Sequence, residues 1–336
     1  MSLLRHPYAE NTTARIEHII SNIEQVIKGK RTIIEHVLIS LLCGGHILFE
    51  DVPGVGKTML VRTIAKTIGC SNKRIQCTPD LLPSDVTGIT ICNPITQDFE
   101  YRPGPVFHHL VHVDELNRTS PKTQAAFLEA MEEGQVTVDG STYELSQPFW
   151  VLATQNPSDH SGTYALPEAQ IDRFFMKLKL GYPSTEDELK LLQRSQLSHP
   201  VAAIENVITL EQFVQLQQQV KGIHIETKLQ EMIVNITNFS RTDVHLRLGA
   251  SPRASIALMR AAQARAMVLG RTYVIPDDIQ HLALPIMEHR LVLTHDAMMR
   301  GWTAEMSVNL AISELRIPIE RFVDQECTST KKLWTR

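Results

Sequence analysis

One segment, ILFEDVPGVGKT at residues 47–58, limits more than any other what this chain can fold into. An apolar run ends in a glycine-rich turn, and Lys57 and Thr58 then open an apolar-periodic stretch. This order predicts a strand, a tight loop and a helix. Because Gly54 and Gly56 lack side chains, consecutive backbone N–H groups of the loop can point inward, and the helix adds the positive end of its dipole. The segment therefore predicts a cradle for a polyphosphate.

The loop also assigns roles to individual residues. Lys57 is expected to reach the β- and γ-phosphates of a nucleotide, and the hydroxyl of Thr58 is expected to bind Mg²⁺. The residues expected to contact the nucleotide are Pro53, Gly54, Val55, Gly56, Lys57, Thr58 and Met59. One position departs from the strict pattern, which asks for glycine where this chain has Asp51. Taken alone, the loop is compatible with a kinase, a GTPase or a transporter subunit.

The composition narrows the classes of protein. The chain has 336 residues, 43% of them hydrophobic, which is enough for two domains with substantial cores. A formal charge of −4 gives no global attraction to nucleic acid or to anionic membranes. No apolar run approaches the roughly 20 residues of a membrane helix. The N-terminus lacks a signal-peptide pattern, and the five cysteines include no CxxC pair, so we expect a cytoplasmic protein with reduced thiols.

The chain divides into two parts with different patterns. Up to about residue 183, short apolar runs alternate with amphipathic segments, which is typical of a parallel sheet covered by helices. The predicted strands are 46–50, 74–77, 110–113, 149–154 and 174–180. After Tyr182-Pro183 the periodicity is helical and no further strand is expected. The predicted helices begin near residues 211, 226, 253 and 276, and Pro285 is expected to separate the last of them from a helix at 286–293.

Two stretches interrupt the first part. Both alternate with a period of two around a turn, so they predict β-hairpins at about 86–103 and at about 135–145. Between them, SPKTQAAFLEAMEE predicts a helix with Ser120 as its N-cap and Pro121 at its first position. A hairpin of this size cannot bury a core of its own. It is either a decoration, or a lever or pore loop that acts on another molecule.

Two acidic residues follow the apolar run that ends at Val113. Phosphoryl transfer needs one carboxylate to hold Mg²⁺ and another group to orient the attacking water. Asp114 suits the first role and Glu115 suits the second. An Asp-Glu pair often marks only the solvated end of a strand, but behind a phosphate-binding loop, in this order, we favour the catalytic interpretation. The guanine-reading NKxD sequence is absent, which favours adenine.

Three further polar residues could act on a nucleotide. Asn156 could sense the γ-phosphate, although its Asn-Pro sequence, taken alone, is better explained as the start of a turn. Arg173 could stabilise transition-state charge at a neighbouring subunit's nucleotide, or form only a surface ion pair with Asp172. Arg253 lies at a predicted helix start with Ser251 as cap. It could bind a phosphate across a cleft, or belong to an ordinary capped helix.

The order and the amino-acid sequences of these segments resemble one branch of the AAA+ ATPases, the MoxR family. This family belongs to the magnesium-chelatase-like, helix-2-insert group. The resemblance runs from about residue 15 to 295 and is weak over the last forty or so residues. It is carried by LLPSDVTG (81–88), FEYRPGPVF (99–107), VDELNRTSPKTQAAFLEAMEEGQVTVDG (113–140), ATQNPSDHSGTYALPEAQIDRFF (153–175), LGASPRA (248–254) and GRTYVIPDDI (270–279).

The resemblance implies a fold and a set of roles. The fold is an α/β P-loop core with a parallel sheet over residues 1–184, a smaller all-α lid over 185–310 and a tail at 311–336. The first hairpin is then an insert in helix two, and the second precedes the sensor-one strand. The residues that match family motifs are Lys57 and Thr58 (Walker A), Asp114 and Glu115 (Walker B), Asn156 (sensor one), Arg253 (sensor two), Arg173 (arginine finger of magnesium-chelatase-like relatives), and Asn117 and Arg118, whose role stays open.

The implied function is Mg²⁺-dependent ATP hydrolysis by a ring-forming homo-oligomer, expected to be a hexamer. ATP is expected between core and lid, with Arg173 completing the neighbour's site, and hydrolysis is expected to shift the two hairpins against a client protein. The resemblance further implies a chaperone-like role in maturing or activating partners, often with a von Willebrand factor A (VWA) domain, sometimes by metal or cofactor insertion.

Two alternatives to a protein-remodelling ATPase stay open. A nucleic-acid-remodelling motor with the same hairpins is disfavoured by the acidic pI of about 6.4 and by the lack of a basic, aromatic-interleaved stretch. A nucleotide-switched scaffold with little turnover would use the same residues, so only kinetics separates it from a motor.

Overall fold

The computed structural model describes residues 7–52, 54–95, 97–156, 163–189 and 204–314. In this part of the chain, five parallel strands form a sheet in the order β2-β5-β8-β1-β9. The strands are β1 (Ile47–Glu50), β2 (Asn72–Gln76), β5 (Leu110–Asp114), β8 (Trp150–Gln155) and β9 (Met176–Leu178). The five strands predicted from the sequence are therefore confirmed, with their ends shifted by one or two residues.

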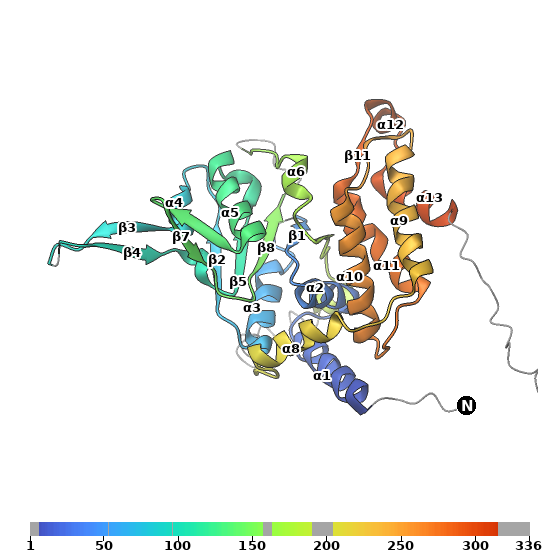
Figure 1. Cartoon of the computed structure of the whole chain (residues 1–336), viewed down its shortest axis with the longest axis horizontal. Helices are drawn as coiled ribbons and strands as arrows, with labels where there is room; N and C mark the ends of the chain where they lie inside the picture. The colour runs from blue at the N-terminus through green and yellow to red at the C-terminus, as the bar shows by residue number, and fades with distance from the viewer. Residues whose placement is uncertain (1–6, 53, 96, 157–162, 190–203, 315–336) are drawn as a thin grey trace, which may run out of the picture.

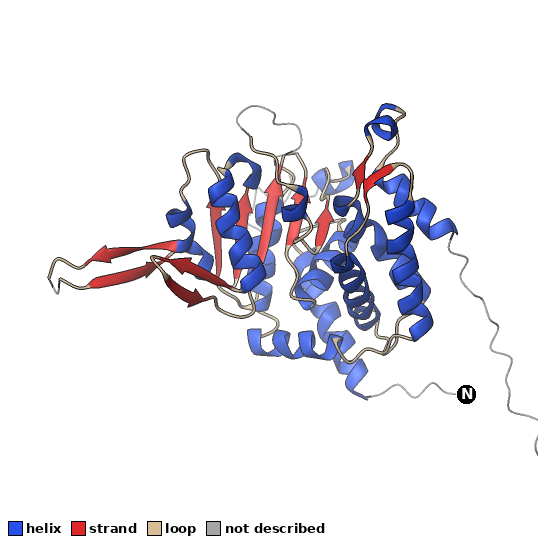
Figure 2. Cartoon of the chain, turned by 45° about the horizontal axis from the view of Figure 1, so that its top comes forward, coloured by secondary structure: helices blue, strands red, loops and turns tan. Residues whose placement is uncertain are grey.

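Helices cover both faces of this sheet (Figure 2). Along β1, Ile47 and Phe49 face the larger apolar cluster while Leu48 faces the smaller one, as the period of two requires. The larger cluster includes α1 (Pro7–Glu24), α2 (Arg31–Leu42) and α3 (Lys57–Ile68), and the smaller one includes α5 (Pro121–Glu133). The predicted cap of α5 is confirmed, because Ser120 Oγ accepts from the backbone N–H of Thr123 and Pro121 occupies the first turn.

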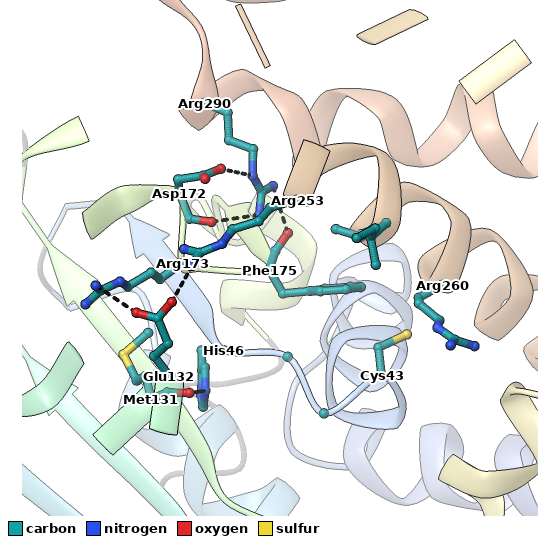
Figure 3. Close-up of a pocket in the computed structure, with 14 residues that line it drawn as sticks. Cys43, His46, Met131, Glu132, Asp172, Arg173, Phe175, Arg253, Arg260 and Arg290 are labelled. Carbon is teal, nitrogen blue, oxygen red and sulfur yellow. Dashed lines mark hydrogen bonds and ion pairs between the residues drawn. The ribbon is translucent and has the colours of Figure 1, made fainter. Parts of the chain in front are cut away.

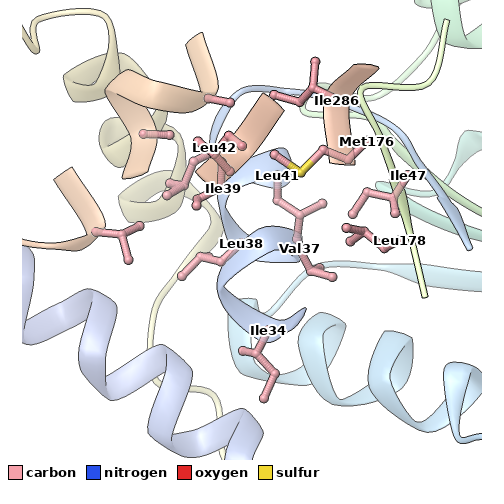
Figure 4. Packing of buried hydrophobic residues seen from close by; sticks show 14 of the residues in the cluster. Ile34, Val37, Leu38, Ile39, Leu41, Leu42, Ile47, Met176, Leu178 and Ile286 are labelled. Atoms are coloured by element: carbon pink, nitrogen blue, oxygen red, sulfur yellow. The ribbon is translucent and has the colours of Figure 1, made fainter. Parts of the chain in front are cut away.

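The larger apolar cluster continues from the sheet into the second half of the chain. Figure 4 shows its centre, where α2 lies between the strands and the later helices. Six apolar residues of α2 are buried: Ile34, Val37, Leu38, Ile39, Leu41 and Leu42. Because α2 is apolar on most of its circumference, it joins the two halves through one continuous core.

The second half consists mainly of helices, as predicted. They are α8 (Leu210–Val220), α9 (Thr227–Thr242), α10 (Pro252–Val268), α11 (Pro276–Met287), α12 (His295–Met299) and α13 (Ala304–Glu314). Within α11, the carboxylate of Asp278 is fully buried and accepts from the guanidinium groups of Arg265 and Arg271 and from the N–H of Ile275. This buried ion pair fastens the start of α11 to the end of α10. None of the described helices is long and apolar enough to span a membrane.

Two expectations about this half are wrong. Strands do not stop at Tyr182, because β10 (Leu246–Leu248) pairs antiparallel with β11 (Val292–Leu293). Three and two residues are too short to show a period in the sequence. Pro285 does not separate two helices either, because α11 runs through it to Met287 and a 3₁₀ turn, η4 (Glu288–Arg290), follows. The proline lies in the last turn of α11, so the hydrogen bond lost with its N–H is near the end of the helix.

Two β-hairpins within the described residues leave the body of the protein. The outer hairpin, β3 (Gly88–Cys92) and β4 (Phe99–Pro103), projects furthest from it, and β6 (Gln135–Val138) and β7 (Ser141–Glu144) lie at its base (Figure 1). The rings of Tyr101 and Tyr143 stack with centroids 3.9 Å apart, so the hairpins contact each other. Gly88 starts the outer hairpin at φ 107°, and a Cβ there would lie 2.3 Å from the carbonyl oxygen of Arg102. The hairpin can therefore begin only with glycine.

Buried histidines predict that the protein loses stability in weak acid. Burial lowers the pKa of His36, His46 and His112 to about 4, below the ordinary value of 6.5. The unfolded chain therefore binds more protons than the folded chain below about pH 6.5. The free energy of unfolding should fall as the pH drops from 6.5 to about 4, by up to about 1.4 kcal/mol per pH unit for each histidine. Urea unfolding at a series of pH values measures this slope.

The variant His112→Leu provides the control. Within the described residues, neither ring nitrogen of His112 has a hydrogen-bond partner, so leucine removes the proton uptake without removing a bond. Its stability should depend less steeply on pH than that of the wild type. An equal slope would show that His112 does not contribute.

Candidate active site

The predicted phosphate-binding loop lies at the mouth of a cavity of about 360 Å³. Gly56 is the N-cap of α3 at φ 97°, and Gly54 has φ 85°, so both occupy the left-handed region that favours glycine. The described residues that line the cavity include Gly54, Gly56, Lys57, Thr58, Met59, Asp114, Glu115 and Asn156, all of them predicted from the sequence. The side chain of Val55 packs against the larger core instead. Pro53 lies outside the described residues.

The ammonium group of Lys57 is held over the loop. Its Nζ donates to the carbonyl oxygens of Asp51 at 3.1 Å and of Val52 at 3.2 Å, and the residue is only 9% exposed. Burial lowers the pKa of Lys57, and the nearby charges of Asp51, Asp114 and Glu115 oppose this effect. The loop thus places a cation where a polyphosphate would enter the cradle.

Asp51, which departs from the strict loop pattern, has a structural role. Its Oδ2 accepts from the backbone N–H of Leu180 and, at 2.9 Å, from that of Gly181. These two residues follow β9, where the chain leaves the sheet. The carboxylate therefore ties the loop to the exit of the sheet by two charge-assisted hydrogen bonds that a glycine could not make.

A threonine on the neighbouring strand fixes the two acidic residues. Thr154 Oγ1 donates to Asp114 Oδ1 at 2.8 Å and accepts from the backbone N–H of Glu115 at 2.9 Å. Burial would raise the pKa of Asp114, but hydrogen bonds from Arg74 and Thr154 outweigh burial and hold it below its ordinary value. Asp114 therefore stays ionised at neutral pH. Sequence reasoning missed the role of Thr154. The only hint in the sequence is that this polar residue directly follows the apolar run Val151-Leu152-Ala153.

Glu115 adopts a backbone conformation that is rare outside glycine. At φ 59° and ψ 51° it lies in the left-handed region, which costs about 1–3 kcal/mol and is often found at functional sites. Its Oε2 accepts from Arg118 at 3.0 Å and from Gln76 at 3.3 Å. The conformation turns the chain sharply after β5, so that the side chain of Glu115 lines the same cavity as Asp114.

Arg74 is a second residue that sequence reasoning missed. It lies on β2 beside β5, and its Nη2 and Nε donate to Asp114 Oδ2 at 2.5 and 3.1 Å. A basic residue in a half-exposed edge strand is common, so the sequence gives no signal for it. The pairing follows from the register of β2 on β5, which places Arg74 opposite His112 and within reach of Asp114.

The two predicted arginines lie together in a different cavity. Arg173 and Arg253 line a hollow of about 470 Å³ with Glu132 between them (Figure 3). Arg173 Nη2 lies 2.7 Å from Glu132 Oε2, and Arg253 Nη2 pairs with the other carboxylate oxygen. Glu132, the last residue but one of α5, was not predicted. The three charges come from α5, the segment after α6 (Glu168–Ile171) and the start of α10.

This placement corrects the expectation that ATP lies between core and lid with Arg253 on it. The residues that the structure shows lining the Lys57 cavity all precede residue 157, so they include none from the second half. The physical reason is the packing of α10 against α1, α2, α9 and α11, which places the start of α10 beside Glu132. Arg253 consequently faces Glu132 rather than Lys57.

The side chains of Asp172 and Ser251 bind partners that the local sequence does not indicate. Asp172 does not pair with Arg173; its carboxylate accepts from Arg290 Nε at 2.8 Å. Ser251 occupies the N-cap position of α10, but its hydroxyl donates to Asp172 at 2.9 Å instead of accepting from the helix. Contacts between the two halves of the chain therefore override what the local sequence predicts.

The role of Asp51 predicts the effect of restoring the strict loop pattern. Asp51→Gly leaves the N–H groups of Leu180 and Gly181 without their acceptor, which should lower the free energy of unfolding by about 1–3 kcal/mol. Asp51→Asn keeps one acceptor oxygen and should lose less stability than Asp51→Gly. Thermal unfolding of the wild type and the two variants measures their order of stability. A glycine variant as stable as the wild type would contradict the structural role.

Comparisons with known proteins agree with this geometry. The family described as "ATPase family associated with various cellular activities (AAA)" matches residues 46–176, and "AAA lid domain" matches residues 238–309. The chain is 52% identical to "Uncharacterized protein YeaC" of Bacillus subtilis (strain 168), covering 94% of this chain and 98% of the relative. It is 37% identical to "Chaperone MoxR1" of Mycobacterium tuberculosis, covering 93% and 84%.

A crystal structure of a protein from Cytophaga hutchinsonii has the same fold. It superposes with a TM-score of 0.87 at 37% identity, covering 92% of this chain and 96% of that chain. The chain belongs to the MoxR family of AAA+ ATPases.

Proposed function

We propose that this ATPase hydrolyses ATP at sites shared between neighbouring subunits of a ring, which we expect to be a hexamer. One subunit supplies the cavity around Lys57 and Glu115, and the next supplies Arg173 and Arg253. The observation that carries the proposal is the separation of the two groups: the arginines lie together around Glu132, in a cavity distinct from that of Lys57. Guanidinium groups bind phosphate oxygens well and stabilise charge in phosphoryl transfer.

The charges of the two cavities support this pairing. The Lys57 cavity has three acidic side chains (Asp51, Asp114, Glu115) and two basic ones (Lys57, Arg74), and bound ATP would add further negative charge. The second cavity has four arginines (Arg173, Arg253, Arg260, Arg290) against two acidic side chains (Glu132, Asp172). Surfaces of opposite charge attract and orient one another when two subunits associate.

The residues present fit Mg²⁺ bound together with ATP. Within the described ranges, no three His, Cys, Asp or Glu side chains form a metal site. Mg²⁺ commonly uses only one or two protein oxygens with waters and substrate phosphates. The hydroxyl of Thr58 and the ionised carboxylate of Asp114 would hold it, and when bound it neutralises charge on the phosphates. Glu115 orients and activates the attacking water, Lys57 binds the phosphates, and Asn156 senses the γ-phosphate.

We further propose that the hairpins act on a client protein and that the chain is a cytoplasmic chaperone. Ile95 and Phe99, near the tip of the outer hairpin, are 90% and 78% exposed, which suits contact with the apolar surface of another protein. A relative of this chain is named a chaperone. The family resemblance suggests a client with a VWA domain that is matured or activated, in some cases by insertion of a metal or cofactor.

Turnover measurements test the assigned catalytic residue. Glu115→Gln removes the group that activates water, so kcat should fall by about 10²–10⁴-fold while ATP still binds. Lys57→Ala should instead weaken ATP binding itself. Glu231→Gln, an exposed change on α9, is the matched control and should leave both quantities unchanged. If wild type and Glu115→Gln hydrolyse ATP equally slowly, the assigned active site is wrong.

The same variant can be used to identify the client protein. Glu115→Gln with ATP should hold the client-bound state long enough to be isolated with its partner. Recovery of a VWA-domain protein would support the chaperone role. Recovery of nucleic acid alone would overturn it.

Mixing two inactive variants tests the shared site. Arg173→Ala keeps the Lys57 cavity, and Lys57→Ala keeps the arginines. Each variant alone should turn over ATP only at a low residual rate, but rings of both chains in equal amounts contain intact sites at about a quarter of the interfaces, as random placement in a symmetric ring requires. ATPase activity should therefore return on mixing. Continued inactivity of mixed rings, with assembly verified by light scattering, would show that Arg173 does not act on a neighbour.

A further inference from the structure

A buried arginine from the second half of the chain holds the segment that carries Arg173. The side chain of Arg290, in η4, is only 3% exposed. Its Nε donates to Asp172 Oδ1 at 2.8 Å, and its Nη2 donates to the main-chain oxygens of Asp172 at 3.1 Å and Phe174 at 2.6 Å. Its Nη1 donates to the main-chain oxygen of Phe175 at 3.3 Å and to that of Ile286. The guanidinium thus contacts the residues on both sides of Arg173 (Figure 3).

Two further groups from the second half hold the same segment. Ser251 Oγ donates to the carboxylate of Asp172 at 2.9 Å. His289 Nε2 lies 3.0 Å from the main-chain oxygen of Phe174, and burial lowers the pKa of His289 well below its ordinary value. The imidazole is therefore neutral, and its Nε2–H is the donor in this bond.

The secondary structure around Arg173 is short. The helix before it, α6 (Glu168–Ile171), is a single turn, and the strand after it, β9, has three residues at the edge of the sheet. The sheet holds the residues after Arg173, because Phe174 is buried in the smaller apolar cluster and the N–H of Phe175 donates to the carbonyl oxygen of His46 at 2.7 Å. Arg290 adds a second constraint, because a displaced segment would leave its buried N–H groups without acceptors, and unpaired buried charge is strongly destabilising.

We propose that Arg290 is a positioning residue for ATP hydrolysis. It fixes residues 172–175 to the lid, so that Arg173 and the lid arginine Arg253 move as one body toward the neighbouring subunit's nucleotide. Glu132 holds the two guanidinium groups at their outer ends, and Arg290 holds the backbone behind Arg173. This inference rests on the proposed function of Arg173. It adds that the lid, together with the sheet, sets the position of the arginine.

A double-mutant cycle on turnover tests this role. Arg290→Lys keeps the charge, but one ammonium cannot reach all the acceptors of a planar guanidinium. Misplacement of Arg173 should lower kcat by about 10- to 100-fold, with KM for ATP within about twofold, because the nucleotide-binding cavity is untouched. Arg173→Ala should lower kcat further. The double variant should be no slower than Arg173→Ala alone, because both changes remove the same interaction.

Two additional variants separate positioning from stability. Arg271→Lys weakens a comparable buried ion pair inside the lid, with Asp278, far from residues 172–175. It should lower the thermal unfolding temperature and leave kcat unchanged at temperatures where it is folded. Asp172→Asn keeps the size of the side chain and the main-chain contacts of Arg290. It should give a smaller loss of kcat than Arg290→Lys. If the Arg290→Lys protein does not fold, Asp172→Asn takes its place in the double-mutant cycle with Arg173→Ala.

The outcomes are distinct. A folded Arg290→Lys protein with wild-type kcat overturns the proposal, and so does a loss that multiplies with that of Arg173→Ala. A rise in KM with unchanged kcat would place the effect of Arg290 on nucleotide binding and also overturn it. If Arg173→Ala itself turns over like the wild type, the proposed function of Arg173 fails first, and the inference about Arg290 fails with it.

Discussion

The phosphate-binding cavity depends on the parallel pairing of β5 with β8 and of β8 with β1. Parallel strands end at the same edge of a sheet, so the polar residues that follow them meet there. In this chain the loop after β1, the acidic pair after β5 and the polar end of β8 converge on one cavity. A register slip of one residue would turn Thr154 to the opposite face and leave Asp114 and the N–H of Glu115 without their shared partner.

The sequence predicts those parts of the structure that depend on neighbours along the chain. The glycine-rich loop, the strand ends and the cap at Ser120 all have short-range signals, and the structure shows each of them. Contacts between distant segments have none. Glu132 lies in an ordinary helical pattern, and nothing in the sequence relates it to Arg173 or Arg253. Ser251 shows the conflict directly, because its hydroxyl binds Asp172, about 80 residues earlier in the chain, instead of capping its own helix.

In the proposed mechanism, the two cavities divide the chemistry of one reaction. The first gathers groups that bind phosphate and activate water, and the second gathers groups that neutralise developing charge. A subunit with this arrangement holds both halves of a site but cannot bring its own halves together, because α2 and the shared apolar core fix the second half against the sheet. Burial of α2 therefore does more than stabilise the fold. It sets the distance between the two cavities, and under the proposed function this distance makes the catalytic site a property of the assembly.

The stacked pair of Tyr101 and Tyr143 gives the hairpins a mechanical property. Tyr101 also bonds the main-chain oxygen of Thr87, at the root of the outer hairpin, so this hairpin cannot bend without moving β7. The strand paired with β7 begins three residues after Glu132. The paired hairpins thus connect the outer tip to the end of α5, where the carboxylate of Glu132 pairs with Arg173 and Arg253. In the proposed ring, resistance from a client at the tip would change how firmly those arginines are held beside the neighbour's nucleotide.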